Sequence, residues 1–180
     1  MALRADALAG AAEMIVAVER HAQDTEGLIA TVGQITVGPN VVNVIPGNVE
    51  FSLEVRSPND ELRHESAAHI TKTCAKIAKD RCLELTSDFT YEQGAQPCDG
   101  KLVAELEAAT RAVHGNVPSL PSGATHDASA MSELCPMAML FVRCRDGTSY
   151  LPEEFASEAD MEVVRRTLSQ LFRNLANKYS

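Results

Sequence analysis

The chain has 180 residues, a formal net charge of −9 and only 4% aromatic residues, with no tryptophan. The negative charge argues against a nucleic-acid or anionic-membrane surface, and no apolar run approaches the roughly 20 residues of a membrane helix. The five cysteines lack metal-knuckle spacing, so we expect free thiols in a reducing cytoplasm, with Cys74 and Cys135 in the core. The absence of a secretory-signal pattern agrees with a cytoplasmic location.

The chain opens with a pattern typical of an amphipathic helix over residues 4–22. Its expected apolar face consists of Leu8, Ala11, Ile15 and Val18. Residues 28–37 are then strand-like, but their apolar alternation changes phase at Gly33, which predicts a β-bulge there. Residues 49–56 alternate apolar and polar side chains and end at Arg56, which predicts a second strand.

A turn at residues 57–60 starts a further helix that we expect to run to about Asp80. Its inward face consists of Ile70, Cys74 and Ile77. Residues 83–91 alternate again and predict a third strand. The order helix, strand, strand, helix, strand indicates a ferredoxin-like α/β sandwich that lacks its first strand. Because residues 92–100 are polar and rich in Gly and Pro, we expect a domain boundary between residues 93 and 94.

The second half predicts a helix over residues 101–113, a loop over 116–127 and a buried strand over 137–142. Ser157 and Asp160 form a capping-box pattern before the final helix. The apolar stripe of that helix consists of Met161, Val164, Leu168, Leu171 and Leu175. A buried parallel strand needs parallel neighbours that this segment does not contain. Residues 94–180 are therefore expected to be part of a larger α/β domain.

Asn43 and Arg56 are the first candidate binding residues. Asn43 stands in a turn-rich apolar segment, and Arg56 ends the strand on its polar face. An amide and a guanidinium suit a carboxylate or a ureido group. From the pattern alone, a surface arginine and a turn asparagine are the simpler interpretation.

Four stretches in this order carry a family resemblance: residues 1–15, 37–56, 121–131 and 147–155. Together they resemble the metal-dependent amidases of the hydantoinase/carbamoylase family, which include N-carbamoyl-L-amino-acid hydrolases, allantoate amidohydrolases and a β-ureidopropionase branch. The resemblance implies an α/β fold in which residues 1–93 are an incomplete ferredoxin-like lid, or dimerisation, domain. It implies that residues 94–180 are the C-terminal portion of an α/β metallohydrolase catalytic domain.

The same resemblance assigns roles to individual residues. It implies that Asn43 and Arg56 bind the substrate's carboxylate and amide across a homodimer formed through the lid. It also implies that His126 contacts the substrate, with Ser122, Gly123 and Ala124 as a backbone platform. An imidazole on a loop that contains glycine can donate to a carbonyl that develops negative charge.

The metal centre implied by the family is incomplete in this sequence. Full-length members use zinc or manganese, and the position of one histidine ligand is taken by Tyr150, whose neutral phenol is a poor zinc ligand. The remaining family ligands lie upstream of where this chain begins. The other four histidines, His21, His64, His69 and His114, are expected to be exposed on helices. We therefore expect no complete catalytic set and no cofactor in this chain alone.

These features predict the C-terminal half of an amidohydrolase acting on the C–N bonds of linear N-carbamoyl or ureido acids, such as an N-carbamoyl amino acid or allantoate. The chain would supply substrate recognition and dimer contacts. A truncated reading frame, a split gene or an expressed fragment would each produce this pattern. Two alternatives remain open: an inactive remnant that acts only as a dimerisation module, and an aminoacylase or peptidase of the same clan.

Overall fold

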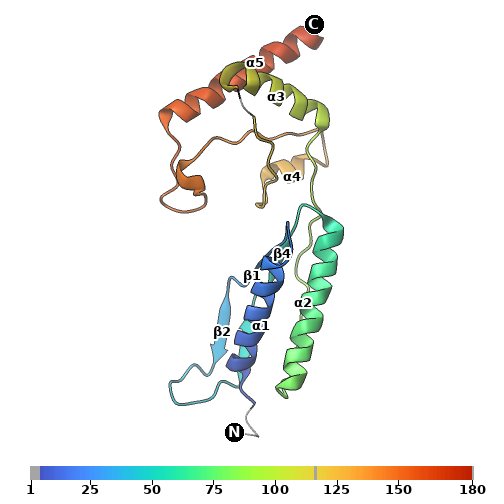
Figure 1. Ribbon diagram of the computed structural model, residues 1–180, viewed down its shortest axis with the longest axis vertical. Helices are drawn as coiled ribbons and strands as arrows, with labels where there is room; N and C mark the ends of the chain where they lie inside the picture. The colour runs from blue at the N-terminus through green and yellow to red at the C-terminus, as the bar shows by residue number, and fades with distance from the viewer. Residues whose placement is uncertain (1–4, 116, 180) are drawn as a thin grey trace. The chain divides into compact units, whose positions relative to one another are not determined.

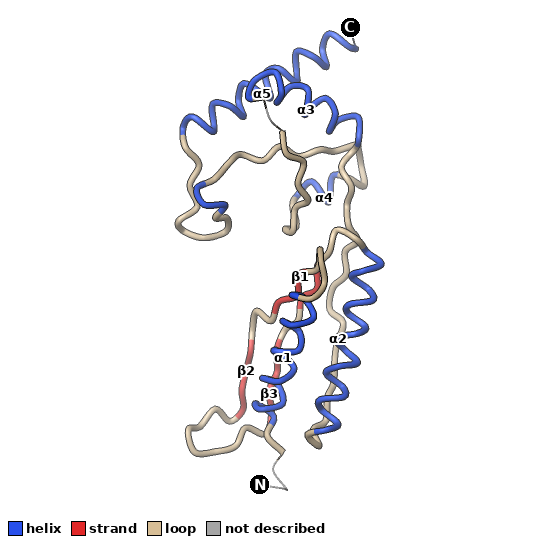
Figure 2. Tube along the Cα trace, in the orientation of Figure 1, coloured by secondary structure: helices blue, strands red, loops and turns tan. Residues whose placement is uncertain are grey.

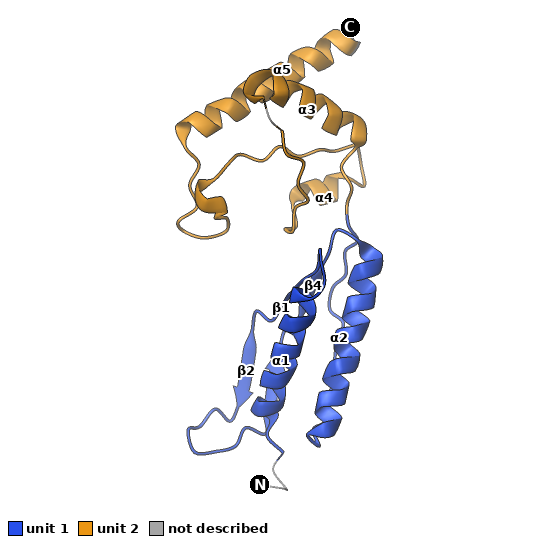
Figure 3. Ribbon diagram, viewed as in Figure 1, with its two compact units in different colours: residues 1–95 blue, residues 96–180 orange. Residues whose placement is uncertain are grey.

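The computed structural model describes residues 5–115 and 117–179. The chain divides into two units, Met1–Ala95 and Gln96–Ser180, which are coloured separately in Figure 3. The expected boundary at residues 93/94 lies close to this division. The identification of the two units as a lid and part of a catalytic domain stays a prediction.

Two capped helices form one layer of the first unit. Helix α1 (Ala7–Gln23) begins at Asp6, whose carboxylate accepts a hydrogen bond from the backbone N–H of Ala9 at 3.1 Å. Helix α2 (Asp60–Asp80) begins in the same way at Asn59. The expected start of α1 at Arg4 lies outside the described residues. Its buried stripe runs through Ala11, Met14 and Val18, so the prediction of Ile15 on this stripe was one position out of phase.

The strands form two antiparallel ladders (Figures 1 and 2). Strand β1 (Ile29–Thr31) pairs with β4 (Glu54–Arg56), and β2 (Ile35–Gly38) pairs with β3 (Asn48–Phe51). Between the ladders, residues 32–34 face only residues 52–53, so the register changes by one residue. The junction is held by a hydrogen bond from the Ser52 N–H to the Gln34 carbonyl at 3.1 Å. This extra residue confirms the bulge predicted at Gly33.

The core of the first unit lies between the two helices and the strands. Helix α1 contacts α2, β1 and β3, and α2 contacts β4. The buried cluster consists of Met14, Val18, Ile70, Cys74, Ile77 and Ala78. The predicted inward face of α2 is therefore confirmed. The side chains that pack against this cluster from the strands include Phe51 and Val55.

The strand predicted over residues 83–91 is wrong. This segment forms no ladder among the described residues, and Phe89 and Tyr91 are largely exposed. Apolar alternation predicts a strand only if a partner strand supplies hydrogen bonds along its edge. The described part of the chain has two short ladders in place of the expected three-stranded sheet. Its α/β character is confirmed, and the finer ferredoxin-like pattern stays a prediction.

The chain leaves the first unit through an anchored segment. Both carboxylate oxygens of Asp60 accept from the Ala95 N–H, at 3.0 and 3.2 Å. Arg63 donates to Asp60 and also to Glu92, at 3.1 and 2.9 Å. The Ala95 hydrogen bond is the main reason that the pKa of Asp60 lies below its usual value. These bonds tie the linker to the first turn of α2.

The second unit is built on two packed helices, α3 (Gly100–His114) and α5 (Glu158–Tyr179). Asp99 caps the start of α3. The first half of the predicted capping box at α5 is confirmed, because the Asp160 N–H donates to Ser157 Oγ at 3.1 Å. The Asp160 carboxylate accepts from the Ser157 hydroxyl. A short helix, α4 (Asp127–Met131), and a 3₁₀ turn, η1 (Arg145–Gly147), complete the described elements.

Two further expectations for this unit were wrong, and a third was confirmed only in part. The segment 137–142 forms no ladder, because the described residues supply none of the parallel neighbours that such a run requires. Cys135 is exposed, whereas Cys74 is buried as expected. The expected stripe of α5 is only partly covered: Leu171 is buried, but Met161 and Leu168 are exposed.

Candidate functional site

Asn43 lies in the loop between β2 and β3. Its turn is closed by a hydrogen bond from the Val44 N–H to the Val41 carbonyl at 3.1 Å, and Asn43 itself is exposed. The base of the loop is held by the Gly47 N–H, which donates to the Gly38 carbonyl at 3.0 Å. The amide of Asn43 is therefore carried on an exposed turn with a fixed base.

Arg56 is the last residue of β4 and faces Ile29 of β1 in the ladder. Its side chain is 39% exposed, and its Nε lies 3.7 Å from a carboxylate oxygen of Glu54. Residues two apart on a strand share one face, which explains this pairing. A carboxylate ligand at Arg56 would compete with Glu54, and exposed pairs of this kind are weak.

The structure does not bring Asn43 and Arg56 together. The β2–β3 loop and the far end of β4 lie at opposite ends of the paired strands (Figure 1). At about 3.3 Å per residue, the strand path from Asn48 to Arg56 covers roughly 25 Å. One copy of the first unit cannot hold one small ligand with both side chains.

The second unit presents His126 from a tight loop. His126 occupies the N-cap position of α4 with extended backbone angles (φ −126°, ψ 155°). The Nε2 atom of His126 lies 2.6 Å from Ser122 Oγ, and Ser122 Oγ also accepts from the Ala124 N–H at 3.2 Å. The ring packs against Phe141, with 5.7 Å between ring centroids. The Ser122–Ala124 turn and Phe141 together orient the imidazole.

The contacts that Ser122 and Phe141 make with His126 differ from the sequence prediction. We expected Ser122 to contribute its backbone, whereas the structure shows its hydroxyl bonded to the imidazole. Phe141 was expected inside a buried strand, but it is 53% exposed and contacts His126. This contact joins residues 15 positions apart, and no local pattern in the sequence indicates it.

Tyr150 lies in an exposed turn with a positive φ of 59°. Its backbone N–H donates to the Glu154 carboxylate at 2.8 Å, and the residue is 74% exposed. Among the described residues, no three His, Cys, Asp or Glu side chains gather where a metal ion could bind. The donor atoms in this part of the chain therefore do not fit the metal centre that the resemblance implies.

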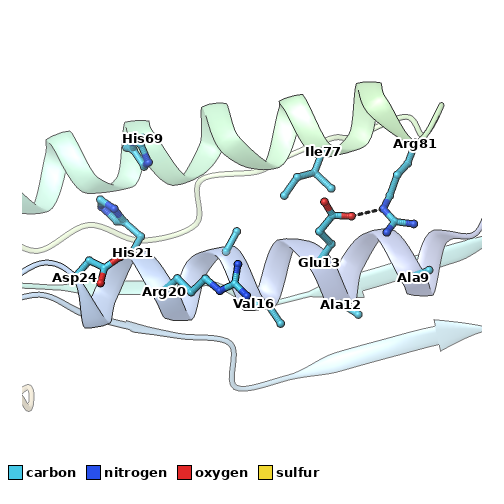
Figure 4. Close-up of a pocket in the computed structure, with 11 residues that line it drawn as sticks. Ala9, Ala12, Glu13, Val16, Arg20, His21, Asp24, His69, Ile77 and Arg81 are labelled. Atoms are coloured by element: carbon cyan, nitrogen blue, oxygen red, sulfur yellow. Dashed lines mark hydrogen bonds and ion pairs between the residues drawn. The ribbon is translucent and has the colours of Figure 1, made fainter.

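A separate groove lies between α1 and α2, and none of the candidate residues lines it (Figure 4). Its polar groups face one another: Arg81 donates to Glu13 at 2.5 Å, and the rings of His21 and His69 are stacked. The expectation that all four remaining histidines are simply exposed was therefore wrong for His21, which is half-buried. It was also incomplete for His64, which bonds Glu92 at 2.5 Å.

Comparison with known proteins identifies the family of the chain. The model of peptidase family M20/M25/M40 matches residues 5–174. The chain belongs to this family. Among curated relatives, N-carbamoyl-L-amino acid amidohydrolase from Geobacillus stearothermophilus is 36% identical over 175 residues, which cover 95% of this chain and 43% of that protein. Allantoate deiminase 1 from Glycine max is 31% identical over 203 residues, covering 98% of this chain and 42% of the relative.

Solved structures agree with this assignment. A hydantoinase/carbamoylase family amidase from Burkholderia vietnamiensis is 34% identical with a TM-score of 0.86, and the match covers 94% of this chain and 42% of that protein. A dinuclear metal-binding M20 peptidase from Bacillus subtilis shares the fold at 18% identity, with a TM-score of 0.66, over 92% of this chain and 45% of that one. The M20 chain described here thus spans about two fifths of the length of the relatives it matches. None of its described helices is both long and apolar enough to cross a membrane.

Proposed function

We propose that this M20 chain supplies the substrate-recognition part of an amidohydrolase that cleaves the C–N bond of linear N-carbamoyl or ureido acids. The names of its relatives support this substrate class, because they include an N-carbamoyl-L-amino acid amidohydrolase and an allantoate deiminase. The observation that carries the proposal is the imidazole of His126, held by the Ser122 hydroxyl on the loop that matches the family motif.

Arg56 and Asn43 are proposed to recognise the carboxylate and the amide of the substrate. A guanidinium on a strand end suits a carboxylate, and an exposed amide suits the carbonyl and N–H groups of a ureido function. Because the two residues lie at opposite ends of the paired strands, their joint action on one small molecule requires two copies of the chain. This separation supports the proposal of a homodimer formed through the first unit.

We do not place the hydrolytic centre among the described residues, because their side chains form no group that fits a metal ion. In the proposed enzyme, zinc or manganese would therefore be held elsewhere. The contribution of this chain is to bind and orient the substrate. A dimerisation module without catalysis is the alternative, favoured by the exposed apolar β2–β3 loop, in which Val41, Val42, Val44 and Ile45 are each at least 47% exposed.

The test is a titration of the isotope-labelled full chain with N-carbamoyl-L-alanine, followed by NMR. We expect chemical-shift changes at Arg56 and His126, and at least a tenfold weaker affinity for Arg56→Lys, because a bidentate contact is lost. Arg20→Lys is the matched control, because Arg20 lies on α1 in the groove between the helices, away from the candidate residues. No shift at either residue, or equal affinities for wild type and Arg56→Lys, would exclude the recognition role.

A further inference from the structure

The Ser122 hydroxyl lies between three polar atoms but has only one hydrogen to donate. Its Oγ accepts from the Ala124 N–H at 3.2 Å, lies 2.6 Å from His126 Nε2 and lies 3.5 Å from the Ala124 carbonyl oxygen. Effective O–H···O bonds measure about 2.5–3.0 Å, so the carbonyl is a poor acceptor at this distance. Of the protein atoms around this hydroxyl, Nε2 is therefore the best-placed acceptor for its hydrogen.

This arrangement decides where the neutral imidazole carries its own hydrogen. If Nε2 accepts from Ser122, the ring hydrogen must be on Nδ1. The tilted Phe141 ring and the N-cap backbone position limit the orientations available to His126. Among the described residues, no group is hydrogen-bonded to Nδ1, so this N–H donor is available to a ligand.

We infer that Ser122 is a positioning residue that holds His126 as the Nδ1–H tautomer, so that His126 acts on its ligand as a hydrogen-bond donor. The acceptor that fits is a carbonyl or carboxylate oxygen, because an N–H donor stabilises negative charge as it develops on oxygen. The substrate class rests on the function proposed above. The tautomer rests on the Ser122 geometry alone.

The same pair of residues invites another interpretation, in which Ser122 is a nucleophile and His126 its base. Such pairs need a third group that orients the base through its other nitrogen. No described carboxylate hydrogen-bonds Nδ1 of His126, so the geometry favours a donor over a nucleophilic pair.

The tautomer is measured by long-range ¹H–¹⁵N correlation of the histidine rings in the full chain at neutral pH. We expect the Nδ1–H pattern for His126 in wild type and its loss in Ser122→Ala. Ser122→Thr keeps a hydroxyl and should keep the pattern. Ser119→Ala removes an exposed hydroxyl from the same loop and should change nothing. An Nε2–H pattern in wild type, or an unchanged pattern in Ser122→Ala, would overturn the assignment.

Two further measurements separate this inference from the proposed function. Adding N-carbamoyl-L-alanine should shift the Nδ1 signal of wild type. If the tautomer is as expected but the ligand leaves Nδ1 unmoved, the donor role toward this substrate class fails while the positioning by Ser122 stands. Mass spectrometry after treatment with a fluorophosphonate should find Ser122 unmodified. Covalent labelling of Ser122 would identify a nucleophile and contradict the positioning role.

Discussion

The rings of His21 and His69 stack across the groove between α1 and α2, with 4.5 Å between their centroids and 20° between their planes. The Nε2 atom of His21 is buried and has no hydrogen-bond partner in the described part of the chain. Two imidazoles this close cannot both become charged without repulsion. The pair therefore couples the packing of the two helices to pH.

We predict that acidification destabilises the first unit through His21. Burial, and then the neighbouring His69, lower the pKa of His21 below its ordinary value of 6.5, although Asp24 acts in the opposite direction. Below about pH 6.5 the unfolded chain takes up a proton that the folded chain resists, so the free energy of unfolding falls as the pH falls. Above about pH 6.5, His21 is neutral in both the folded and the unfolded chain, so it causes no such destabilisation.

Urea unfolding across this pH range measures the effect. His21→Phe retains an aromatic ring that can stack but cannot take up a proton, so its stability should depend less on pH than that of wild type. The same pH dependence in the variant and in wild type would rule out His21 as the sensor.

A second prediction concerns the close approach of Gly10 and Leu83. A Cβ at Gly10 would overlap the Cδ1 atom of Leu83, which packs on the core of the first unit. Overpacking typically costs about 1–3 kcal/mol, whereas replacing a helical glycine by alanine gains about 1 kcal/mol. We expect Gly10→Ala to destabilise wild type by about 1 kcal/mol, because the overlap outweighs the gain in helix propensity.

The effect of Gly10→Ala on stability should change from destabilising to stabilising when the Leu83 side chain is shortened. In a Leu83→Ala background the space is free, and Gly10→Ala should stabilise the chain by about 1 kcal/mol through helix propensity alone. Denaturant unfolding of the four proteins in this double-mutant cycle measures both effects. Additive changes would show that the two residues do not meet in solution.

The third prediction concerns metal. We expect the isolated chain to bind no stoichiometric zinc or manganese, because Tyr150 replaces the histidine of the family motif and the described side chains form no ligand cluster. Elemental analysis after dialysis against either metal measures this. The Tyr150→His variant regains one histidine ligand, but it should still bind zinc or manganese only weakly, because one imidazole does not make a binuclear site. A content near one metal ion per wild-type chain would contradict the prediction.

The fourth prediction concerns self-association. The first unit exposes Val42 fully, together with Phe89 and Tyr91 on a segment that pairs with no described strand. Burial of such apolar surface is favourable by roughly 25 cal/mol per Å², and unpaired backbone edges invite another chain. We expect a homodimer or a higher assembly in light scattering at micromolar concentration, with binding of a hydrophobic dye above that of an ordinary globular protein. A monomeric mass without dye binding would show that the chain covers these surfaces itself.

The sequence by itself determined the features that depend on near neighbours. The four long helices were expected within a few residues of their observed bounds, because helical periodicity and caps such as Ser157 with Asp160 act within one or two turns. The bulge at Gly33 was visible as a change of phase along one strand. The family was visible in the order of four short motifs, and the family match confirms it.

Only the tertiary structure decided the features that need a distant partner. The segments 83–91 and 137–142 have the alternation or apolar content of strands, but a strand exists only where another strand supplies its hydrogen bonds. The contact of His126 with Phe141, and the placement of Asn43 and Arg56 at opposite ends of the paired strands, depend on where loops and ladders meet in space. A sequence pattern specifies which face of a segment is apolar, whereas packing specifies what that face meets.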